Sequence, residues 1–195
     1  MNENDIDLEK RRFLTQTTVA LGAVGTAFAA VPFINYLKPG AGTLESGAPI
    51  DVDITKLEPA QMIRVEWRGQ PIWVLKRTDE MLTSLDELEP VLRDPQSDES
   101  VQPESCKNKY RSIKPEVFVA VGICTHLGCS PTYRPEAAPP DLGKEWLGGF
   151  FCPCHGSRFD LAGRVYKKVP APTNLVVPPY YYETDTRIIV GEERT

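Results

Sequence analysis

The longest hydrophobic run of the chain extends from Phe13 to Leu37 and contains no charged side chain. An α-helix rises about 1.5 Å per residue, so this run spans about 37 Å and exceeds the roughly 30 Å hydrocarbon core of a bilayer. Three basic residues, Lys10 to Arg12, precede it, and basic residues favour the cytoplasmic side of a membrane. The pattern predicts a cytoplasmic N-terminus over residues 1–12, a transmembrane anchor over 13–37 and everything after Lys38 on the far side.

A cleaved signal peptide is the alternative interpretation of this run, because Ala27-Phe28-Ala29 has the small-x-small pattern of a cleavage site. The run is longer than the usual core of a signal peptide and continues to Ile34, which favours a retained anchor. Lys10 to Leu14 also resembles a twin-arginine export signal, with Lys10 in the place of the first arginine. Export by that route implies that the domain folds and receives its cofactor before it crosses the membrane.

Residues 38–49 are rich in glycine and small side chains and hold two prolines. Such a composition buries little surface and allows many backbone states, so it predicts a flexible tether. An ordered surface loop is the alternative. The position between an anchor and a domain favours the tether.

From residue 50 to residue 195 the hydrophobic pattern is mostly that of short strands. Expected strands are Met62–Trp67, Pro71–Lys76, Val117–Val121, Gly149–Phe151 and Arg187–Val190. The first two flank Arg68-Gly69-Gln70 and predict a hairpin. The exported part is therefore expected to be mainly antiparallel β-structure with long loops.

One segment of the domain has helical periodicity. Between Thr78 and Glu89, four apolar residues recur at the spacing of one helix face. Thr78 is a suitable N-cap, and Pro90 is expected to end the helix.

Composition and charge limit the possible partners of the chain. Its 195 residues suffice for one medium domain and an appendage. The formal net charge is -5, and no basic stripe stands out that could neutralise phosphates, which argues against nucleic acid as a partner. Two polar segments, residues 94–110 and 133–145, look like surface insertions. Cys106 is interpreted as a partly buried, unreactive thiol, and a contact with another molecule is the less favoured alternative.

Both histidines and four of the five cysteines lie in two short segments. The first is Cys124-Thr-His126-Leu-Gly-Cys129, and the second is Cys152-Pro-Cys154-His155-Gly-Ser157. Two segments with this content predict a metal site between two facing loops. If one cysteine and one histidine of each loop are ligands, one cysteine of each loop remains for a disulfide, which would add about 3 to 4 kcal/mol by loop closure.

Two metal centres suit two cysteines and two histidines. Zinc accepts such a set, although structural zinc sites usually draw on a different spacing and need no disulfide beside them. In a [2Fe-2S] cluster, replacing two thiolates by neutral imidazoles removes two negative charges, so the cluster accepts an electron more readily. A zinc-stabilised binding domain and an electron carrier both remain possible on the residue types alone.

The two segments resemble the signature of Rieske iron-sulfur proteins. Together with the anchor and the tether, the whole chain resembles the Rieske subunits of bacterial quinol-cytochrome c reductases, the cytochrome bc1 complexes. The resemblance implies an antiparallel Rieske-type β-sandwich with a small cluster-binding subdomain at about residues 122–172. It also implies one [2Fe-2S] cluster per subunit, in a proton-translocating respiratory enzyme of the bacterial cell membrane with the cluster domain in the periplasm.

By motif position, the resemblance assigns Cys124 and Cys152 to one iron and His126 and His155 to the other. It assigns the disulfide to Cys129 and Cys154. The implied partners are cytochrome b, cytochrome c1 and a quinol, expected by analogy to be ubiquinol, in a dimeric complex.

The resemblance also implies roles around the cluster. His155 hydrogen-bonds quinol and accepts its proton, and Leu127 contacts the wall of the quinol pocket at the docking tip. The Ser157 hydroxyl donates to a cluster sulfide; the simpler roles are local packing for Leu127 and a turn for Ser157.

Two positions depart from the family pattern. Phe159 stands where many members have a tyrosine that donates to a ligating cysteine sulfur, and Val169 replaces a common glycine at the start of the proline loop Val169-Pro-Ala-Pro172. Without the tyrosine donor, the reduction potential is expected to be lower than in tyrosine-bearing relatives. Two other exported or soluble Rieske proteins remain as alternatives: the small subunit of an arsenite oxidase and a ferredoxin that serves an oxygenase.

Overall fold

The computed structural model describes residues 7–38, 40 and 47–194. The chain divides into two compact units, residues 1–45 and residues 46–195. The predicted tether, residues 38–49, falls largely on residues outside the described part, as do residues 1–6 of the predicted cytoplasmic terminus. The tether stays a prediction.

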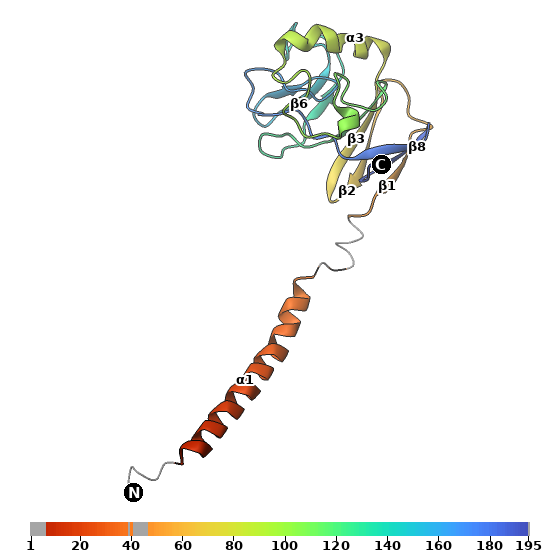
Figure 1. Cartoon of the computed structure of the whole chain (residues 1–195). Coiled ribbons are helices and arrows are strands. Elements are labelled where there is room, and N and C mark those ends of the chain that lie inside the picture. The colour runs from red at the N-terminus through yellow and green to blue at the C-terminus, as the bar shows by residue number, and fades with distance from the viewer. Residues whose placement is uncertain (1–6, 39, 41–46, 195) are drawn as a thin grey trace. The chain divides into compact units, whose positions relative to one another are not determined.

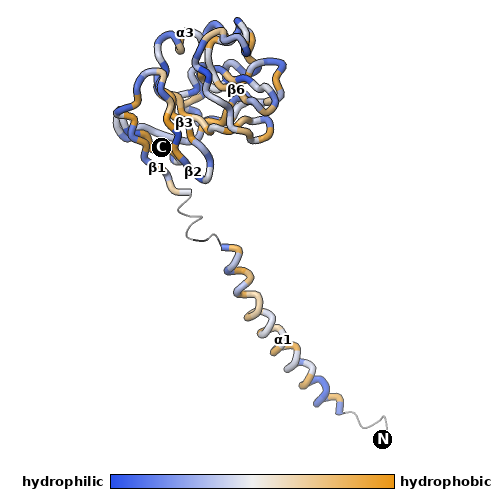
Figure 2. The backbone as a smooth tube through the Cα atoms, turned by 180° about the vertical axis from the view of Figure 1, so that it is seen from behind, coloured by the Kyte–Doolittle hydropathy of each residue, from blue (hydrophilic) through white to orange (hydrophobic). Residues whose placement is uncertain are grey.

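The described residues of the first unit form the helix α1 (Leu8–Tyr36). Asp7 caps it, because the Asp7 carboxylate accepts hydrogen bonds from the backbone N–H groups of Glu9 and Lys10. The helix is long and apolar enough to cross a membrane, and none of its residues is buried. Figure 2 shows orange and pale turns along most of α1, with blue turns mainly toward its N-terminal end. All of the apolar run predicted as an anchor except Leu37, the C-cap, lies in this helix, which begins five residues earlier because of the Asp7 cap.

The second unit is built from three antiparallel sheets of three strands each (Figure 1). The first sheet has the order β2 (Met62–Trp67), β3 (Gln70–Lys76) and β4 (Val117–Val121). Arg68 and Gly69 join β2 to β3, and both have positive φ, 53° and 69°. Two positive φ values in a two-residue loop are typical of the type I′ turn, whose twist matches that of the strands. The predicted hairpin is present, with Gln70 in the strand instead of the turn.

The second sheet joins the two ends of the unit. Its order is β1 (Ile50–Asp53), β9 (Arg187–Val190) and β8 (Tyr180–Thr184). The third sheet has the order β5 (Thr132–Arg134), β6 (Gly149–Cys152) and β7 (Ser157–Phe159). Its strands border the two cysteine- and histidine-bearing segments, so this sheet positions the candidate site.

The predicted helix is α3 (Asp79–Leu88), which lies along one side of the sheets (Figure 1). The Thr78 hydroxyl accepts a hydrogen bond from the backbone N–H of Met81 at 3.3 Å, as an N-cap does. Leu85 and Leu88 are buried. Two 3-10 turns, η1 (Glu89–Val91) and η2 (Glu104–Cys106), follow in the chain.

The core has a large and a small part. The large part includes Trp73, which stacks on Phe150 with ring centroids 4.9 Å apart, and so joins the first sheet to the third. The small part lies around Trp146 and contains Leu88, Leu92, Leu142 and Tyr166.

The prediction that residues 94–110 form a surface insertion is wrong in part, because exposed residues alternate there with buried ones. Asp94, Ser97 and Cys106 are buried, and Asp94 holds the segment together by accepting hydrogen bonds from the Asp98 N–H at 2.8 Å and the Ser100 hydroxyl at 2.6 Å. Asn174 donates to the Asp94 carbonyl at 2.9 Å. Polar residues are buried here because each finds a partner within the fold.

The prediction that residues 133–145 form a surface insertion is also wrong in part. Tyr133 and Arg134 belong to β5, and Leu142 is buried in the small core.

Cys106 is fully buried, beyond the partial burial expected, and burial raises the pKa of its thiol. Such a thiol is inert and has no access to another molecule.

A buried ion pair stabilises the turn that follows β7. Asp160 accepts hydrogen bonds from the backbone N–H groups of Ala162 and Arg164, and its other oxygen lies 2.7 Å from Nε of Arg164. Both side chains are at most 1% exposed. Arg164 also donates to the Leu85 carbonyl at 2.6 Å and so ties the segment to α3.

Asp160→Asn should lower the free energy of unfolding by about 3 to 5 kcal/mol, because it leaves the buried Arg164 charge without compensation. Urea unfolding of the full chain measures this change. The matched control is Asp51→Asn, which removes an exposed ion pair with Arg187 and should change stability by less than about 1 kcal/mol. Equal effects of the two substitutions would contradict a structural role for the buried pair.

Candidate metal centre

The first loop of the site follows β4 and closes on itself. The Cys124 N–H donates to the Cys129 carbonyl at 2.7 Å, and the Gly128 N–H donates to the Cys124 carbonyl at 3.1 Å. Gly128 has φ of 83°, a left-handed conformation that favours glycine. These bonds fold the segment into a tight turn with residues 125–128 at its outer end.

The second loop is the connection between β6 and β7. Cys152 and Ser157 are the last paired residues of the two strands, and the Gly156 N–H donates to the Cys152 carbonyl at 2.9 Å. Gly156 also has a left-handed φ, 76°. The loop therefore holds Pro153 to His155 at the end of a hairpin, with Cys152 at its base.

A disulfide between Cys129 and Cys154 joins the two loops, with Cα atoms 6.7 Å apart. The two residues are 25 positions apart in the chain, so the closed loop removes entropy from the unfolded chain worth about 3 to 4 kcal/mol. This bond holds the loops side by side whether or not a metal is present.

Cys124 and Cys152 are free thiols, and each is only 2% exposed. Burial raises the pKa of the Cys152 thiol, and the adjacent Cys124 acts in the same direction. Backbone N–H groups of Cys154 and His155 oppose this shift, because they donate toward the sulfur. A metal that takes these thiols as thiolates must therefore displace their protons.

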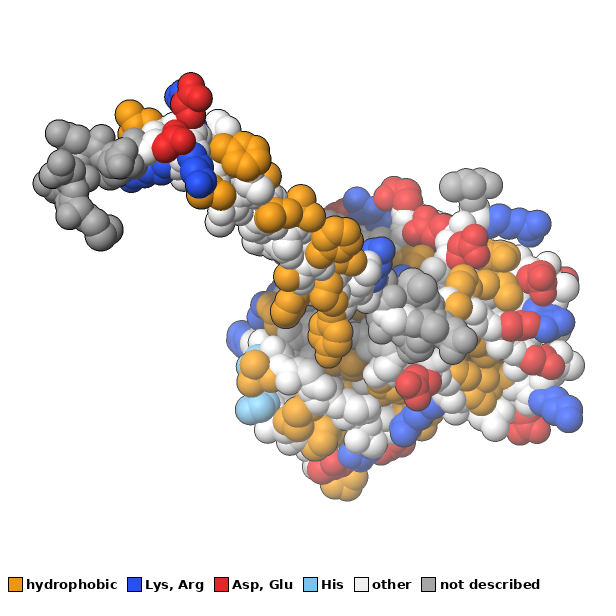
Figure 3. All heavy atoms as spheres, turned by 90° about the horizontal axis from the view of Figure 1, so that it is seen from below, with side chains coloured by type: hydrophobic (Ala, Val, Ile, Leu, Met, Phe, Trp, Pro, Cys, Tyr) orange, Lys and Arg blue, Asp and Glu red, His pale blue; other side chains and the backbone are white. Residues whose placement is uncertain are grey.

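His126 and His155 lie against each other at the outer side of the loops. Their ring centroids are 4.7 Å apart and the rings are perpendicular. His155 is exposed and His126 is half-buried. Figure 3 shows the pale-blue histidine side chains at one edge of the domain surface, beside hydrophobic side chains. The sulfur groups thus lie inside and the imidazoles outside.

These groups fit a [2Fe-2S] cluster with two cysteine and two histidine ligands. Two free buried thiols and two imidazoles occur in two loops that a disulfide already holds together. The sulfur of Cys152 lies within 4.8 Å of both disulfide sulfurs, so this free thiol is next to the disulfide. Thiolates and imidazoles are soft and borderline ligands that suit iron-sulfur clusters.

Two hydroxyl groups attach the proline loop to the ligand loops. The buried Ser157 hydroxyl accepts a hydrogen bond from the Ala171 N–H at 3.1 Å, and the Thr125 hydroxyl donates to the Thr173 carbonyl at 2.7 Å. Since the Ser157 oxygen acts as an acceptor here, its own proton stays available for another acceptor. The sequence motifs drew attention to Ser157, whereas nothing in them pointed to Thr125.

Gly122 is a further residue that sequence reasoning missed. A Cβ atom at this position would lie 2.3 Å from the Trp73 ring, and the Gly122 N–H donates to the Pro71 carbonyl at 2.7 Å. Only glycine lets the chain pass this close to the ring just before Cys124. Its position two residues before Cys124 is the only signal that the sequence offers.

Leu127 is 71% exposed at the outer end of the first loop. An apolar side chain this exposed gains nothing from the fold of its own domain. The local packing role considered for Leu127 therefore finds no support in its burial.

The fold and the site define a class of protein, the Rieske [2Fe-2S] proteins. A family model described as "Rieske [2Fe-2S] domain" matches residues 99–180, which include both loops. A second model, described as "Ubiquitinol-cytochrome C reductase Fe-S subunit TAT signal", matches residues 1–40.

Curated relatives narrow the class to one family. The chain is 56% identical over 194 residues to the "Ubiquinol-cytochrome c reductase iron-sulfur subunit" of Allochromatium vinosum, covering all of this chain and 94% of that protein. It is 42% identical to the protein of the same name from Rhodospirillum rubrum, over 93% of this chain and 91% of the relative. The chain belongs to the family of ubiquinol-cytochrome c reductase iron-sulfur subunits.

A mitochondrial relative and a solved structure are also similar to this chain. The Rieske-5 subunit of the cytochrome b-c1 complex of Nicotiana tabacum is 40% identical over 74% of this chain and 47% of that protein. A solved chain from "Hyperthermophilic respiratory Complex III" is 24% identical and covers 89% of this chain and 98% of its own length, with a TM-score of 0.49.

Phe159→Tyr should raise the reduction potential of the cluster. Phe159 is fully buried in β7, two residues after Ser157, so a hydroxyl added to its ring enters a site shielded from water. One hydrogen bond that favours the reduced form by about 0.5 to 1.5 kcal/mol raises a one-electron potential by about 20 to 65 mV. A redox titration followed by circular dichroism measures the shift.

The matched control is Phe151→Tyr, at a half-buried position of the neighbouring strand β6, which should leave the potential unchanged. If Phe159→Tyr does not raise the potential, the interpretation that the missing tyrosine hydroxyl lowers the reduction potential is wrong.

Proposed function

We propose that this chain is the electron-transfer subunit of a cytochrome bc1 complex, where it takes single electrons from a quinol and passes them to cytochrome c1. Cytochrome b and cytochrome c1 are its proposed partners, in a dimeric complex. The observation that carries this proposal is the pair of disulfide-linked loops, which combine two buried free thiols with two outward histidines. The names of the bacterial relatives support it.

The proposed ligands of the cluster are Cys124 and Cys152 for one iron and His126 and His155 for the other. When bound, a [2Fe-2S] cluster supplies a one-electron redox couple. The burial of both cysteines keeps water from the sulfur side. The Ser157 hydroxyl, whose proton is not engaged by its bond to Ala171, is the proposed donor to a cluster sulfide.

His155 and Leu127 are proposed to meet the quinol and its binding pocket. The His155 ring is exposed, so a quinol hydroxyl can donate a hydrogen bond to it and transfer a proton. Leu127 offers an exposed apolar side chain one residue after His126, which suits contact with the wall of a hydrophobic pocket. The half-buried His126 is less accessible for this role.

The proposed topology places residues 1–12 in the cytoplasm, an anchor at 13–37, the tether at 38–49 and the cluster domain, 50–195, in the periplasm. The length of α1 and the three basic residues at its start support this orientation. The match of residues 1–40 to a twin-arginine signal model supports export of a folded domain. The names of the relatives favour this assignment over the small subunit of an arsenite oxidase.

Leu127→Asp should reduce quinol-dependent cytochrome c reduction by at least tenfold in the purified complex. A carboxylate at the tip needs about 1.4 kcal/mol or more of desolvation to enter an apolar pocket, which corresponds to this factor. Steady-state turnover and the spectrum of the reduced cluster are measured on the same sample. Cytochromes b and c1 should co-purify with the wild-type chain.

The control is Val101→Asp, which changes another exposed apolar residue, 67% exposed, that lies outside the two loops. It should leave turnover unchanged. Full turnover of Leu127→Asp, or a wild-type chain that purifies without the two cytochromes, would count against the proposed function.

A further inference from the structure

A pocket of about 540 Å³ lies beside β7 and reaches Gly156 of the second ligand loop. The rest of its wall comes from four separate parts of the chain: η1, the end of the 133–147 segment, β7 and the residues that lead into the proline loop. Pockets of about 300 to 1,000 Å³ are typical of small-molecule sites, so this one has room for more than a single ion.

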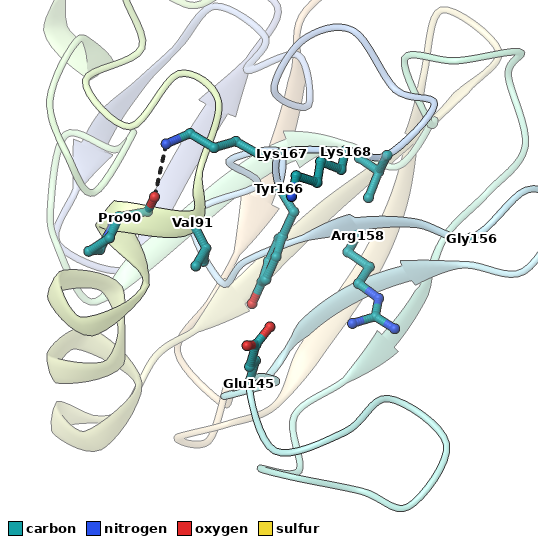
Figure 4. A pocket seen from close by; sticks show the side chains of 9 residues that line it. Pro90, Val91, Glu145, Gly156, Arg158, Tyr166, Lys167 and Lys168 are labelled. Atoms are coloured by element: carbon teal, nitrogen blue, oxygen red, sulfur yellow. Dashed lines mark hydrogen bonds between the residues drawn. The ribbon is translucent and has the colours of Figure 1, made fainter.

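A buried hydroxyl group without a partner lies in this pocket. Tyr166 lines it and is 6% exposed, and within the described residues its hydroxyl makes no hydrogen bond. Burial raises the pKa of Tyr166, so the phenol stays a neutral donor at physiological pH. Figure 4 shows the Tyr166 hydroxyl directed toward the carboxylate of Glu145 across the pocket, with the Arg158 guanidinium to one side. A buried donor without an acceptor is unfavourable unless something else accepts from it.

The charged groups of the pocket are exposed or half-buried and do not pair with one another. Half-buried Arg158 donates from Nη1 to the Leu142 carbonyl at 3.1 Å, and its side chain makes no other hydrogen bond to the described residues. Among the described residues, neither Lys168 nor Glu145 has an ion pair or a side-chain hydrogen bond, although both line the same pocket. Lys167, in contrast, donates to the Pro90 carbonyl at 2.9 Å (Figure 4). Two free cations, one free anion and one free hydroxyl therefore share one space.

The backbone at Lys168 supports a functional interpretation of the pocket. Its φ is 59°, in the left-handed region that a residue with a side chain rarely adopts. Such conformations are concentrated at binding and catalytic sites, where the surrounding structure holds them in place.

We propose that this pocket binds a phosphate group that carries a primary amine, the chemistry of a phosphoethanolamine headgroup. Arg158, Lys168 and the Tyr166 hydroxyl donate to the phosphate oxygens, and Glu145 accepts from the ammonium group. Three separate donors can be met by the oxygens of one phosphate group, and hydrogen bonds to a charged group of this kind are the stronger ones. The free carboxylate of Glu145 disfavours a simple anion, so the ligand must also present a cation.

Isothermal titration calorimetry of the full-length, cluster-loaded protein in detergent tests this proposal. Phosphoethanolamine should bind saturably, and more tightly than inorganic phosphate or ethanolamine. Lys168→Gln and Tyr166→Phe should each weaken binding by about tenfold or more, as expected for a hydrogen bond to a charged group. Glu145→Gln should abolish the preference for phosphoethanolamine over inorganic phosphate.

Two controls separate binding from folding. Lys144→Gln changes an exposed lysine outside the pocket and should bind as the wild type does. Tyr166→Phe removes a hydroxyl that has no partner in the described structure, so its thermal midpoint should not fall. The visible spectrum of the cluster, measured on every variant, should stay unchanged.

A parallel titration with dihexanoyl phosphatidylethanolamine distinguishes the source of the headgroup. Tighter binding of the short-chain lipid indicates a membrane lipid, and tighter binding of phosphoethanolamine indicates a soluble molecule; either result supports the proposal. Absence of saturable binding by both, or equal binding by the wild type and the three pocket variants, overturns it. The proposal goes beyond electron transfer and does not depend on it.

Discussion

The disulfide between Cys129 and Cys154 is the bond on which the arrangement of the metal centre depends. Each ligand loop is a short turn held by its own backbone hydrogen bonds, and within the described residues this is the one covalent link between them. It brings two free thiols under the loops and two histidine rings over them. The proposed function depends on this arrangement, because it leaves the histidine side of the loops open to a partner.

The rest of the domain holds the two disulfide-linked loops in position. Trp73 stacks on Phe150 and joins the first sheet to the third, and Gly122 permits the close passage of the chain beside the same ring. Behind the third sheet, the buried pair of Asp160 and Arg164 ties the chain after β7 to α3. Packing and buried polar contacts thus position the sheet, and the sheet positions the loops.

The sequence predicted the features that depend on local pattern or on a specific motif. The β2–β3 hairpin, β4, β9 and the Thr78 cap follow from periodicity and turn chemistry, and the Rieske family follows from the two segments. The short strands β5 and β7 were missed, because three residues give no periodicity and pairing with β6 alone defines them. The burial of Asp94 and the pocket around Tyr166 arise from contacts between residues far apart in the chain. The polar composition of these segments gives no sign of such contacts.

The proposed ligands of the [2Fe-2S] cluster are two histidines and two cysteines of the linked loops. Electron paramagnetic resonance of the dithionite-reduced chain, combined with nitrogen hyperfine spectroscopy on protein labelled with ¹⁵N-histidine, tests this ligand set. We expect a reduced-cluster signal with couplings from two histidine nitrogens in the wild type. A colourless protein, or a cluster signal without histidine coupling in the wild type, would contradict it.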